Sequence, residues 1–332
     1  YSAFKDLKKA FDPKNILNPG KIIETPPMDS NLRFGKNYKT EKIDTFLSFE
    51  NEGGFAQAIE MCNGQAACKK INSGYMCPSF MATRDEVDST RGRANALRAA
   101  LSGKLPIQEL NSKKLFNVLD LCLECKTCRS ECPSGVDMAK IKYEFLHQYY
   151  KKNRIPIRSI LTGNIATLSK LGSIFPNIFN LTRKLSIFKF LSDYVLKIDK
   201  RREIPKIAPY SFEKLYKSDS NGKNKVAIFF HDTFTNYNHP QVGLSAVKIL
   251  KSLNYKVKLI DKKCCGRPLI SKGLLGSAKK NALHNIEKLY SHVKEGAIVV
   301  GAEPSCISAL KDEYPDMFPK DERVNLISEN TY

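Results

Sequence analysis

Four closely spaced cysteines constrain this chain more than any other feature of its sequence. They follow the pattern C-x2-C-x2-C-x3-C-P and are Cys122, Cys125, Cys128 and Cys132. This spacing is typical of the bacterial run that binds a [4Fe-4S] cluster, in which three thiolates surround one cubane and the fourth cysteine serves a second cluster. Zinc is the alternative metal, but zinc modules usually pair two C-x2-C knuckles. The run therefore predicts an iron-sulfur site.

An upstream group of cysteines supplies the second half of such a pair incompletely. Cys77 is followed by proline, as Cys132 is, and the group also contains Cys62 and Cys68. If the ligands cross between the two halves, one cluster takes the thiolates of Cys77, Cys122, Cys125 and Cys128. The other takes only Cys62, Cys68 and Cys132, because Gln65 stands midway between Cys62 and Cys68, where a further cysteine is expected. An unidentified group completing a [4Fe-4S] cluster, a three-iron cluster and an empty site all stay open, and we favour an occupied site.

The remaining sequence predicts a mainly helical first part and a small α/β second part. Helices are expected at 1–11, at 41–61 with an interruption at Gly53-Gly54, after Ser89, at 112–121 and from about 138, and no strand pattern occurs in 40–150. After about 224, three short apolar runs, KVAIFF, KVKLI and AIVV, alternate with helical patterns. One of these helices is expected to bury Val242, Ala246, Val247, Ile249, Leu250 and Leu253. Such alternation predicts a small parallel sheet, so the fold class is α+β and multidomain.

Charge and hydropathy limit the surroundings in which the chain works. The net charge is +20, and residues 151–206 hold 13 Lys or Arg against 3 Asp or Glu. This segment is also apolar, which favours contact with an anionic membrane or an acidic redox partner, whereas a generally Lys-rich composition explains the charge equally well. No uninterrupted run of eighteen apolar residues occurs and no leader is evident, so the expected location is the cytoplasm, peripheral to the inner face of a membrane. In that reducing compartment, ten cysteines are better explained as ligands than as disulfides.

Three motifs together resemble the C-terminal half of fused FAD-binding and iron-sulfur-binding oxidoreductases, relatives of D-lactate dehydrogenase and of the glycolate oxidase iron-sulfur subunit. FDPKNILNPGKI resembles the end of the FAD-linked oxidase C-terminal domain. MCPSF with TRGRANALRAAL, and CLECKTCRSECPSGVDMAKIK, resemble the dicluster module that follows it. The resemblance implies a tail of the oxidase domain at 1–25, an all-α dicluster ferredoxin-like module at 40–150 and a basic helical linker at 151–224.

A later segment resembles the cysteine-rich CCG domain of the same family and of heterodisulfide reductases. It contains Cys264, Cys265 and Cys306 and implies an α/β domain at 225–332. The family places an earlier cysteine after the first strand, but His231 and Asp232 stand there in this chain. We therefore weigh a metal or redox site equally against a degenerate structural domain. The family domain usually occurs as two copies, so a single copy implies a truncated chain.

The resemblance also implies a division of labour between cofactors. A flavin, FAD, in the N-terminal part missing from this sequence would oxidise a D-2-hydroxy acid such as D-lactate or glycolate. Two iron-sulfur clusters would then pass the electrons to a quinone or cytochrome. We nominate no catalytic acid, base or nucleophile in this chain. Arg91, Arg93 and Arg98 are expected to face the clusters and raise their potentials, unless they are solvent-facing helix residues.

Two other functions remain possible on the sequence. The chain is alternatively a separate iron-sulfur subunit, like those of glycolate oxidase or anaerobic glycerol-3-phosphate dehydrogenase, although residues 1–22 argue against this. A basic nucleic-acid-binding protein with a structural cluster is disfavoured. Phe175, Phe179, Phe188 and Phe190 follow apolar periodicity rather than an exposed stacking pattern, so nucleic acid is not an expected partner.

Overall fold

The computed structural model describes residues 1–32, 34–217 and 225–332, which form two compact units, 1–41 and 42–332. The first unit contains helix α1 (Ser2–Phe11), as the sequence predicted, and the chain leaves it at Asp12. The Asp12 carboxylate accepts hydrogen bonds from the backbone N–H groups of Ile16 and Leu17 at 2.9 and 2.8 Å, which fixes the turn after the helix. No residue of α1 is buried within this unit.

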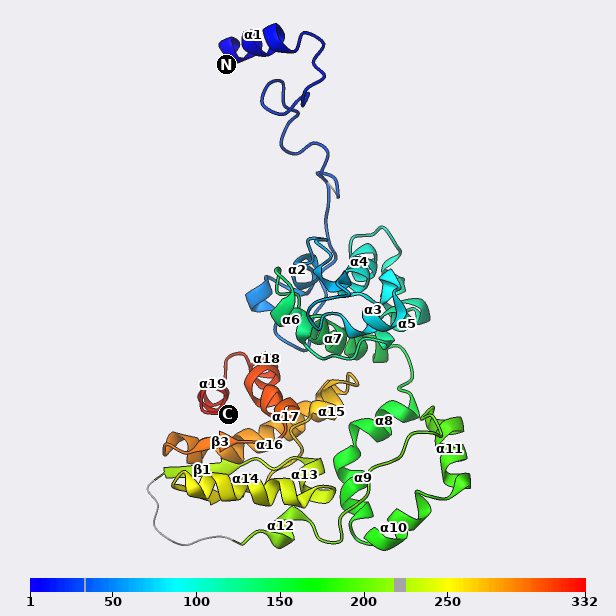
Figure 1. Ribbon diagram of the computed structural model, residues 1–332, viewed down its shortest axis with the longest axis vertical. Helices are drawn as coiled ribbons and strands as arrows, with labels where there is room; N and C mark the ends of the chain where they lie inside the picture. The colour runs from blue at the N-terminus through cyan, green and yellow to red at the C-terminus, as the bar shows by residue number, and fades with distance from the viewer. Residues whose placement is uncertain (33, 218–224) are drawn as a thin grey trace. The chain divides into compact units, whose positions relative to one another are not determined.

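The second unit begins with an all-helical region that contains seven of the cysteines. Its α-helices are α2 (Phe55–Glu60), α3 (Pro78–Thr83), α4 (Thr90–Leu101), α5 (Lys113–Asp120), α6 (Thr127–Glu131) and α7 (Met138–Tyr150). Short 3-10 turns lie at Glu50–Glu52, Ala67–Lys69, Glu86–Asp88 and Ile107–Asn111. Residues 40–150 are all described and contain no strand, as expected. Figure 1 shows these helices, in blue-green, gathered around the cysteine loops.

Side-chain caps explain where three of these helices begin. Ser89, Ser112 and Asp137 each accept a hydrogen bond from a backbone N–H in the first turn of α4, α5 and α7, respectively. The capped starts fix the helices that flank the cysteine loops. In α7, the four residues spaced to share one helix face are all buried: Met138, Ile141, Phe145 and Tyr149.

The prediction of a helix from residue 41 is wrong for its first nine residues. Residues 41–49 are irregular, and helical structure begins only at Glu50. The reason is a buried carboxylate on α7: Glu144 accepts hydrogen bonds from the backbone N–H groups of Phe46 and Leu47. These two N–H groups are thereby satisfied outside a helix, while Leu47 is inserted into the core.

Short helices occupy the segment that the sequence identified as a basic linker. They are α8 (Ile157–Gly163), α9 (Ile165–Gly172), α10 (Pro176–Thr182), α11 (Ser186–Leu196) and α12 (Phe212–Leu215). The last part of the expected linker, 218–224, lies outside the described residues. Among the described residues, no helix is both long and apolar enough to cross a membrane.

The final region contains the predicted parallel sheet. Its strands are β1 (Lys225–Phe229), β2 (Tyr255–Lys258) and β3 (Ile298–Val300), in the order β2-β1-β3 and all parallel. The helices around it are α13 (Thr233–Tyr237), α14 (Pro240–Ser252), α15 (Arg267–Ile270), α16 (Leu275–Lys294), α17 (Pro304–Ser308), α18 (Tyr314–Met317) and α19 (Glu322–Glu329), with a π-helical turn at Ala309–Glu313. The expectation of a mostly helical chain with a small parallel sheet is therefore confirmed.

The two faces of the central strand pack into different apolar clusters. Ala227 and Phe229 join Val247 and Leu250 of α14, whereas Ile228 joins the cluster that contains the buried face of α16. This alternation follows from the two-residue period of a strand. The expected buried face of α14 is only partly correct.

Three residues expected on that buried face, Val242, Ile249 and Leu253, are 50%, 60% and 61% exposed. Val247 and Leu250 are buried, and Gly243 approaches the ring of Phe212 closely. Because the contact with Phe212 and the sheet covers only a narrow stripe of α14, the three apolar residues beside that stripe stay at the surface.

Candidate metal centre

The cysteine run lies in a loop that two helices hold at its ends. Cys122 follows α5 and is half-buried, Cys125 is exposed, and Cys128 is buried within α6. Cys132 ends α6, and its backbone N–H is hydrogen-bonded to the carbonyl of Cys128. The run is therefore folded as one turn-rich loop rather than as an extended segment.

A cavity in this region is lined by four of the cysteines, Cys77, Cys122, Cys125 and Cys128. These are the four thiols that the crossed pattern assigns to one cluster. Cys77 reaches the cavity because Pro78 begins α3 directly after it, and Met138 and Ala139 of α7 line the cavity as well. Sequence-distant thiols thus meet around a single hollow.

The backbone of the loop is shaped to receive a negatively charged group. Glu124 and Lys126, which alternate with the cysteines, have φ values of 59° and 60°. Left-handed residues in such alternation turn successive N–H groups toward one concave side, and such nests are found at many iron-sulfur sites. Non-glycine residues pay conformational energy for this geometry, which is characteristic of functional loops. The donors and the loop therefore fit a cluster ligated by thiolates.

Two buried cations flank the cavity. The guanidinium of Arg93, 0% exposed, lies 3.7 Å through Nη1 from Cys77 Sγ and donates to Ser79 Oγ at 3.0 Å and to the Val118 carbonyl at 3.1 Å. Lys142 Nζ donates to the carbonyl of Cys122 at 2.7 Å and pairs with Glu124 at 2.9 Å. Both cations stabilise negative charge in the cavity.

The thiol pKa values reflect burial and these cations. Burial raises the pKa of Cys122 despite the charges of Lys142 and Arg93, and it raises that of Cys128 to about 12. At Cys77, burial acts in the same direction, but the hydrogen bond with Ser79 and the charge of Arg93 outweigh it and lower the pKa. Cys77 is therefore the most readily ionised of these three thiols.

The second predicted ligand group includes Cys62 and Cys68, and fewer contacts define its surroundings. Cys62 and Cys68 are buried, and the backbone N–H of Arg91 lies 3.4 Å from Cys68 Sγ. Burial, together with the nearby thiols of Cys62 and Cys77, raises the pKa of Cys68. Gln65, in the position of the absent cysteine, is exposed.

A carboxylate ties the two cysteine segments together. Glu131, directly before Cys132, accepts hydrogen bonds from the backbone N–H groups of Tyr75 at 2.9 Å and Met76 at 3.1 Å.

Over the described part of the chain, no three His, Cys, Asp or Glu side chains converge on a point suited to one metal ion. A cubane differs from a single ion in this respect, because each of its irons takes its own cysteine.

The three late cysteines form a separate group. Cys265 Sγ and Cys306 Sγ are 3.0 Å apart and buried, with Cys264 half-buried beside them. Asn285 fixes the loop by bonding Lys263 through both its oxygen and its nitrogen. The neighbouring thiol of Cys265 and burial raise the pKa of Cys264, so the Cys264 thiol is protonated at neutral pH.

His231 does not take over the role of the cysteine that the CCG family has at this place. Its Nε2 is hydrogen-bonded to Glu213 at 2.7 Å, and the ring is 1% exposed. Burial lowers the pKa of His231 even though Glu213 opposes this effect. The imidazole is accordingly committed to a hydrogen bond with Glu213 of α12.

Ion pairs join the loop that carries Cys122, Cys125, Cys128 and Cys132, called the cluster loop below, to the C-terminal region of the same unit. Lys126 contacts Asp312 at 3.0 Å and Glu313 at 2.6 Å, and Arg129 contacts Asp312 at 3.1 Å. Arg267 pairs with Glu313 at 2.6 Å and donates to the carbonyl of Glu124 at 3.1 Å. The loop that carries the cysteines is therefore held by side chains from two later helical segments.

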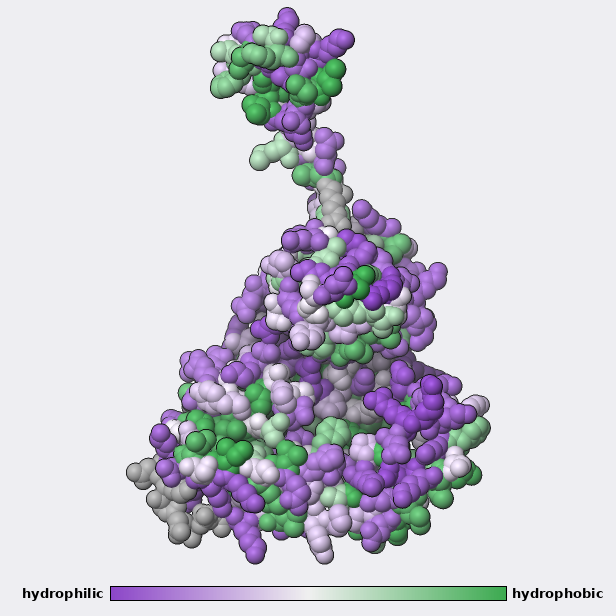
Figure 2. All heavy atoms as spheres, viewed as in Figure 1, coloured by the Kyte–Doolittle hydropathy of each residue, from purple (hydrophilic) through white to green (hydrophobic). Residues whose placement is uncertain are grey.

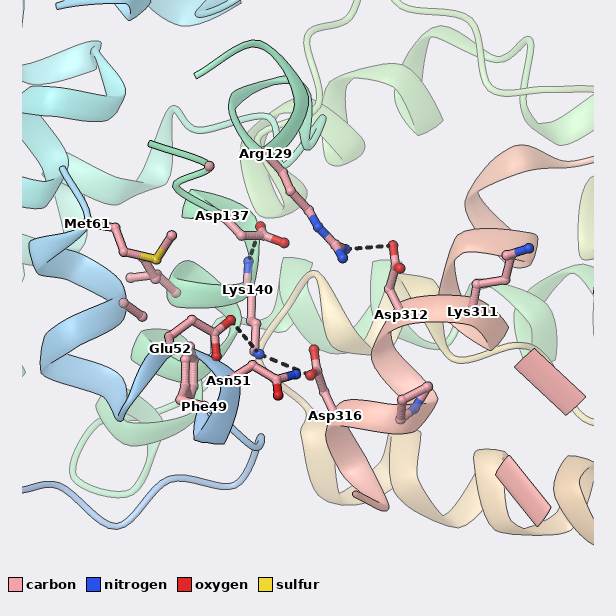
Figure 3. Close-up of a pocket in the computed structure, with 14 residues that line it drawn as sticks. Phe49, Asn51, Glu52, Met61, Arg129, Asp137, Lys140, Lys311, Asp312 and Asp316 are labelled. Atoms are coloured by element: carbon pink, nitrogen blue, oxygen red, sulfur yellow. Dashed lines mark hydrogen bonds and ion pairs between the residues drawn. The ribbon is translucent and has the colours of Figure 1, made fainter. Parts of the chain in front are cut away.

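A polar cavity of about 200 Å³ lies beside these ion pairs. Figure 3 shows Lys140 pointing between Glu52 and Asp316, with Nζ 3.0 Å from a carboxylate oxygen of each, and Arg129 pointing toward Asp312. Burial raises the pKa of Asp316 to about 6, although Lys140 opposes the shift. The cations and carboxylates that line this cavity pair with one another, so they do not form a set of ligands for one bound group.

The sequence patterns pointed to Arg93 but missed Lys142 and Arg267. A signal for Lys142 was present: it lies four residues after Met138 and three before Phe145, so it shares the apolar face of that helix. A lysine in that register needs buried acceptors, which the loop carbonyls and Glu124 provide. No local pattern marked Arg267, because its partners are distant in sequence.

Comparisons with known proteins identify domains at three places. Residues 61–137 match the 4Fe-4S dicluster domain, residues 228–311 match the cysteine-rich domain, and residues 1–22 match the C-terminal domain of FAD linked oxidases. These are the three resemblances that the sequence motifs indicated. No solved structure matches the chain.

Curated relatives agree with these domains. The C subunit of anaerobic glycerol-3-phosphate dehydrogenase from Escherichia coli (strain K12) is 35% identical over 180 residues, which cover 52% of this chain and 45% of the relative. D-2-hydroxyglutarate dehydrogenase of Pseudomonas putida is 26% identical over 369 residues, covering 95% of this chain and 36% of the relative. The glycolate oxidase iron-sulfur subunit of Escherichia coli (strain K12) is 34% identical over 84 residues, covering 24% of this chain and 19% of the relative.

The chain spans less than half the length of each of these relatives. It carries a dicluster domain and a cysteine-rich domain and is homologous to iron-sulfur subunits and to a dehydrogenase that acts on a D-2-hydroxy acid. The expected cofactor class, iron-sulfur clusters, is confirmed.

Proposed function

We propose that this chain carries electrons from a flavin to a membrane-associated acceptor through two iron-sulfur clusters. The observation that supports this most strongly is the cavity lined by Cys77, Cys122, Cys125 and Cys128, inside a matched dicluster domain. Thiolates in that arrangement hold a cluster that accepts and releases one electron at a time. Arg93 and Lys142 supply positive charge beside the cavity and so favour the reduced, more negative state.

We propose the ligands residue by residue. Cys77, Cys122, Cys125 and Cys128 hold one cubane, and Cys62, Cys68 and Cys132 hold the second. Gln65 is exposed, and so a group from outside the cysteine set completes the second cluster or that cluster has three irons. The pairing of Tyr75 and Met76 with Glu131 supports the crossed arrangement, because it brings the segment before Cys77 against the segment before Cys132.

For Cys264, Cys265 and Cys306 we keep both sequence-based alternatives. The close approach of Cys265 to Cys306 supports a redox or metal role. The committed hydrogen bond of His231 with Glu213, and the protonated state of Cys264, support a structural role.

We propose four parts along the chain. They are the tail of an oxidase domain at 1–25, the dicluster module at 40–150, the basic helical linker at 151–224 and the CCG domain at 225–332. Support comes from the matches at 1–22, 61–137 and 228–311. The exposed apolar residues of the first unit, such as Phe4 at 63% and Phe11 at 81%, are consistent with a segment that packs on a flavin domain.

The substrate that we propose for the flavin domain is a D-2-hydroxy acid. The similarity to D-2-hydroxyglutarate dehydrogenase extends over 95% of this chain, including residues that precede the dicluster domain. A separate iron-sulfur subunit is the second candidate, favoured by the higher identity, 35%, to the relative from glycerol-3-phosphate dehydrogenase. The match of residues 1–22 to an FAD-linked oxidase domain favours the fused arrangement.

We further propose that α8 to α11 dock on an anionic membrane. Fourteen large apolar side chains between Ile157 and Val195 are at least 38% exposed, and basic residues lie among them. Figure 2 shows apolar atoms at the rim formed by α10 and α11. Exposed apolar and basic side chains together bind anionic lipid surfaces, each cation contributing about 1 kcal/mol.

Electron transfer is tested with the anaerobically reconstituted chain. Reduction by dithionite should bleach the broad absorbance at about 400 nm that thiolate-bound clusters give, and ferricyanide should restore it. A chain in which Cys77, Cys122, Cys125 and Cys128 are all serine should lose about half of this reversible change, because one of the two proposed clusters is removed. If the quadruple variant keeps the full amplitude, the cavity does not hold a cluster.

A further inference from the structure

The edge of the cluster loop exposes apolar side chains next to an exposed cysteine. Leu121 is 44% and Leu123 is 67% exposed, on either side of Cys122. Of the seven cysteines in the two ligand groups, all described by the structure, Cys125 alone is exposed. A cluster bound in this cavity would therefore approach the surface at this edge, and the surface there is apolar. Exposed apolar patches on otherwise polar proteins mark interaction sites.

The apolar helices begin beside this edge. Arg158, in the first turn of α8, lies 3.9 Å from a carboxylate oxygen of Asp120, the residue before Leu121. Ile157 and Ile160 on the same helix are 60% and 43% exposed. The exposed apolar surface of α8 thus starts at the position where the cluster loop begins.

A second connection fixes α8 relative to the loop. Gly163, at the end of α8, approaches side-chain atoms of Leu269 and Leu274 closely. Leu269 lies on α15, whose first residue, Arg267, donates to the carbonyl of Glu124 inside the cluster loop. Both ends of α8 are therefore tied to the loop, one through Asp120 and one through α15.

We propose that Leu121, Leu123, Ile157 and Ile160 form the surface through which electrons leave the cavity of Cys77, Cys122, Cys125 and Cys128 toward a quinone dissolved in an anionic bilayer. This inference rests on the proposed function and adds the place at which electrons leave the protein. Electron tunnelling weakens steeply with distance, so the acceptor must reach the exposed edge of the cavity. The four aliphatic side chains favour an apolar acceptor. The 13 Lys or Arg against 3 Asp or Glu in residues 151–206 favour a bilayer with anionic lipids.

The electron balance of this step is simple. Reduction of one quinone to a quinol takes two electrons and two protons. One electron comes from each of the two reduced clusters, and the protons come from water. The cavity that contains Cys125 is the exit in this scheme, and the electron held by the group of Cys62, Cys68 and Cys132 leaves through it.

The test measures reoxidation of the reduced, reconstituted 332-residue chain by stopped-flow absorbance. One oxidant is ubiquinone in vesicles that contain phosphatidylglycerol, and the other is ferricyanide in solution. The exit variant is the double change Leu121→Gln and Leu123→Gln, and the ratio of its quinone rate to its ferricyanide rate should fall about tenfold. The matched control is Leu253→Gln at the end of α14, a leucine that is 61% exposed and far along the chain from the cysteine loop. Its ratio should equal that of the unaltered chain.

A second variant guards against damage to the loop itself. Ile157→Gln with Ile160→Gln changes only α8 and should lower the same ratio with iron content unchanged. Equal ratios for both double variants and the unaltered chain would overturn the surface assignment, as would an equal fall in Leu253→Gln. A wild-type chain that ferricyanide reoxidises but vesicle quinone does not would also overturn it, leaving cluster-based electron transfer intact. Absence of iron would instead overturn the proposed function.

Discussion

Replacing Arg93 should lower the reduction potential of one cluster and leave the other nearly unchanged. Arg93 is fully buried, and its Nη1 lies 3.7 Å from Cys77 Sγ. Two unit charges about 4 Å apart interact by about 4 kcal/mol at an effective dielectric constant of about 20. The added electron is spread over a whole cluster, and Asp88 at 3.5 Å partly offsets the guanidinium, so about half of that interaction, or less, acts on the electron.

The expected shift for Arg93→Met is therefore on the order of −100 mV or somewhat less, since about 59 mV corresponds to 1.4 kcal/mol for one electron. The sign follows because the cation stabilises the reduced, more negative state. An EPR-monitored redox titration measures the two clusters separately. Arg93→Lys keeps the charge, loses the planar donor geometry and should shift the potential less.

Arg202→Met, at an exposed arginine, is the matched control and should leave both potentials unchanged. Arg93→Met also leaves Asp88 without its cation, and so some loss of stability accompanies the change. Arg93→Lys remains informative if the methionine variant does not hold iron. An unchanged potential for both Arg93 variants, with iron retained, would refute the assignment of Arg93 to the cluster.

Three further predictions follow from the described contacts. Cys125→Ser and Cys132→Ser should remove different clusters, so the two variants should keep different EPR signals, and identical residual signals would contradict the crossed ligands. Burial raises the pKa of Asp316 from 3.8 to about 6, so between these two pH values the folded state holds a proton that the unfolded state has lost, and its stability falls as pH rises through this range. In urea unfolding, Asp316→Asn should therefore gain about 1–3 kcal/mol relative to wild type between pH 5 and pH 7.5. Asp321→Asn should show no such gain, because hydrogen bonding to Arg323 lowers the pKa of Asp321. Replacing the exposed Lys170, Lys184 and Lys200 by Gln should weaken sedimentation with anionic vesicles, in a salt-dependent manner, and equal binding to neutral vesicles would contradict membrane docking by charge.

The choice of lysines in that experiment depends on the structure. By sequence alone, Arg183 belongs to the basic surface of the linker, but it is 6% exposed and donates to the carbonyl of Ile204 at 2.9 Å. Its replacement would disturb the fold rather than the surface. Net charge along a sequence does not reveal which cations are buried.

Local patterns predicted the helices whose starts are capped and the strands whose apolar runs are continuous. Ser89 before α4 is one example, and the buried run of β1 is another. The region at 41–49 was predicted wrongly because Glu144, a residue about a hundred positions later, holds its backbone N–H groups. No local pattern contains a contact of that kind.

In the candidate site, too, local spacing predicted some features, and contacts between distant residues determined the others. Spacing alone predicted that Cys77 joins Cys122, Cys125 and Cys128, and the structure brings these four to one cavity. Spacing could not predict the supports of the loop, because Lys126 is held by Asp312 and Glu313. Those contacts depend on how the later helices return to the loop, which follows from tertiary packing.

Metal analysis of the anaerobically reconstituted chain tests the central claim most directly. Iron, acid-labile sulfide and zinc are counted per polypeptide, with the four-serine variant of Cys77, Cys122, Cys125 and Cys128 measured in parallel. Two cubanes predict about eight irons and eight sulfides in the unaltered chain, about seven irons if the second cluster has three, and a loss of about four irons in the variant. Stoichiometric zinc without iron in the unaltered chain would contradict the account.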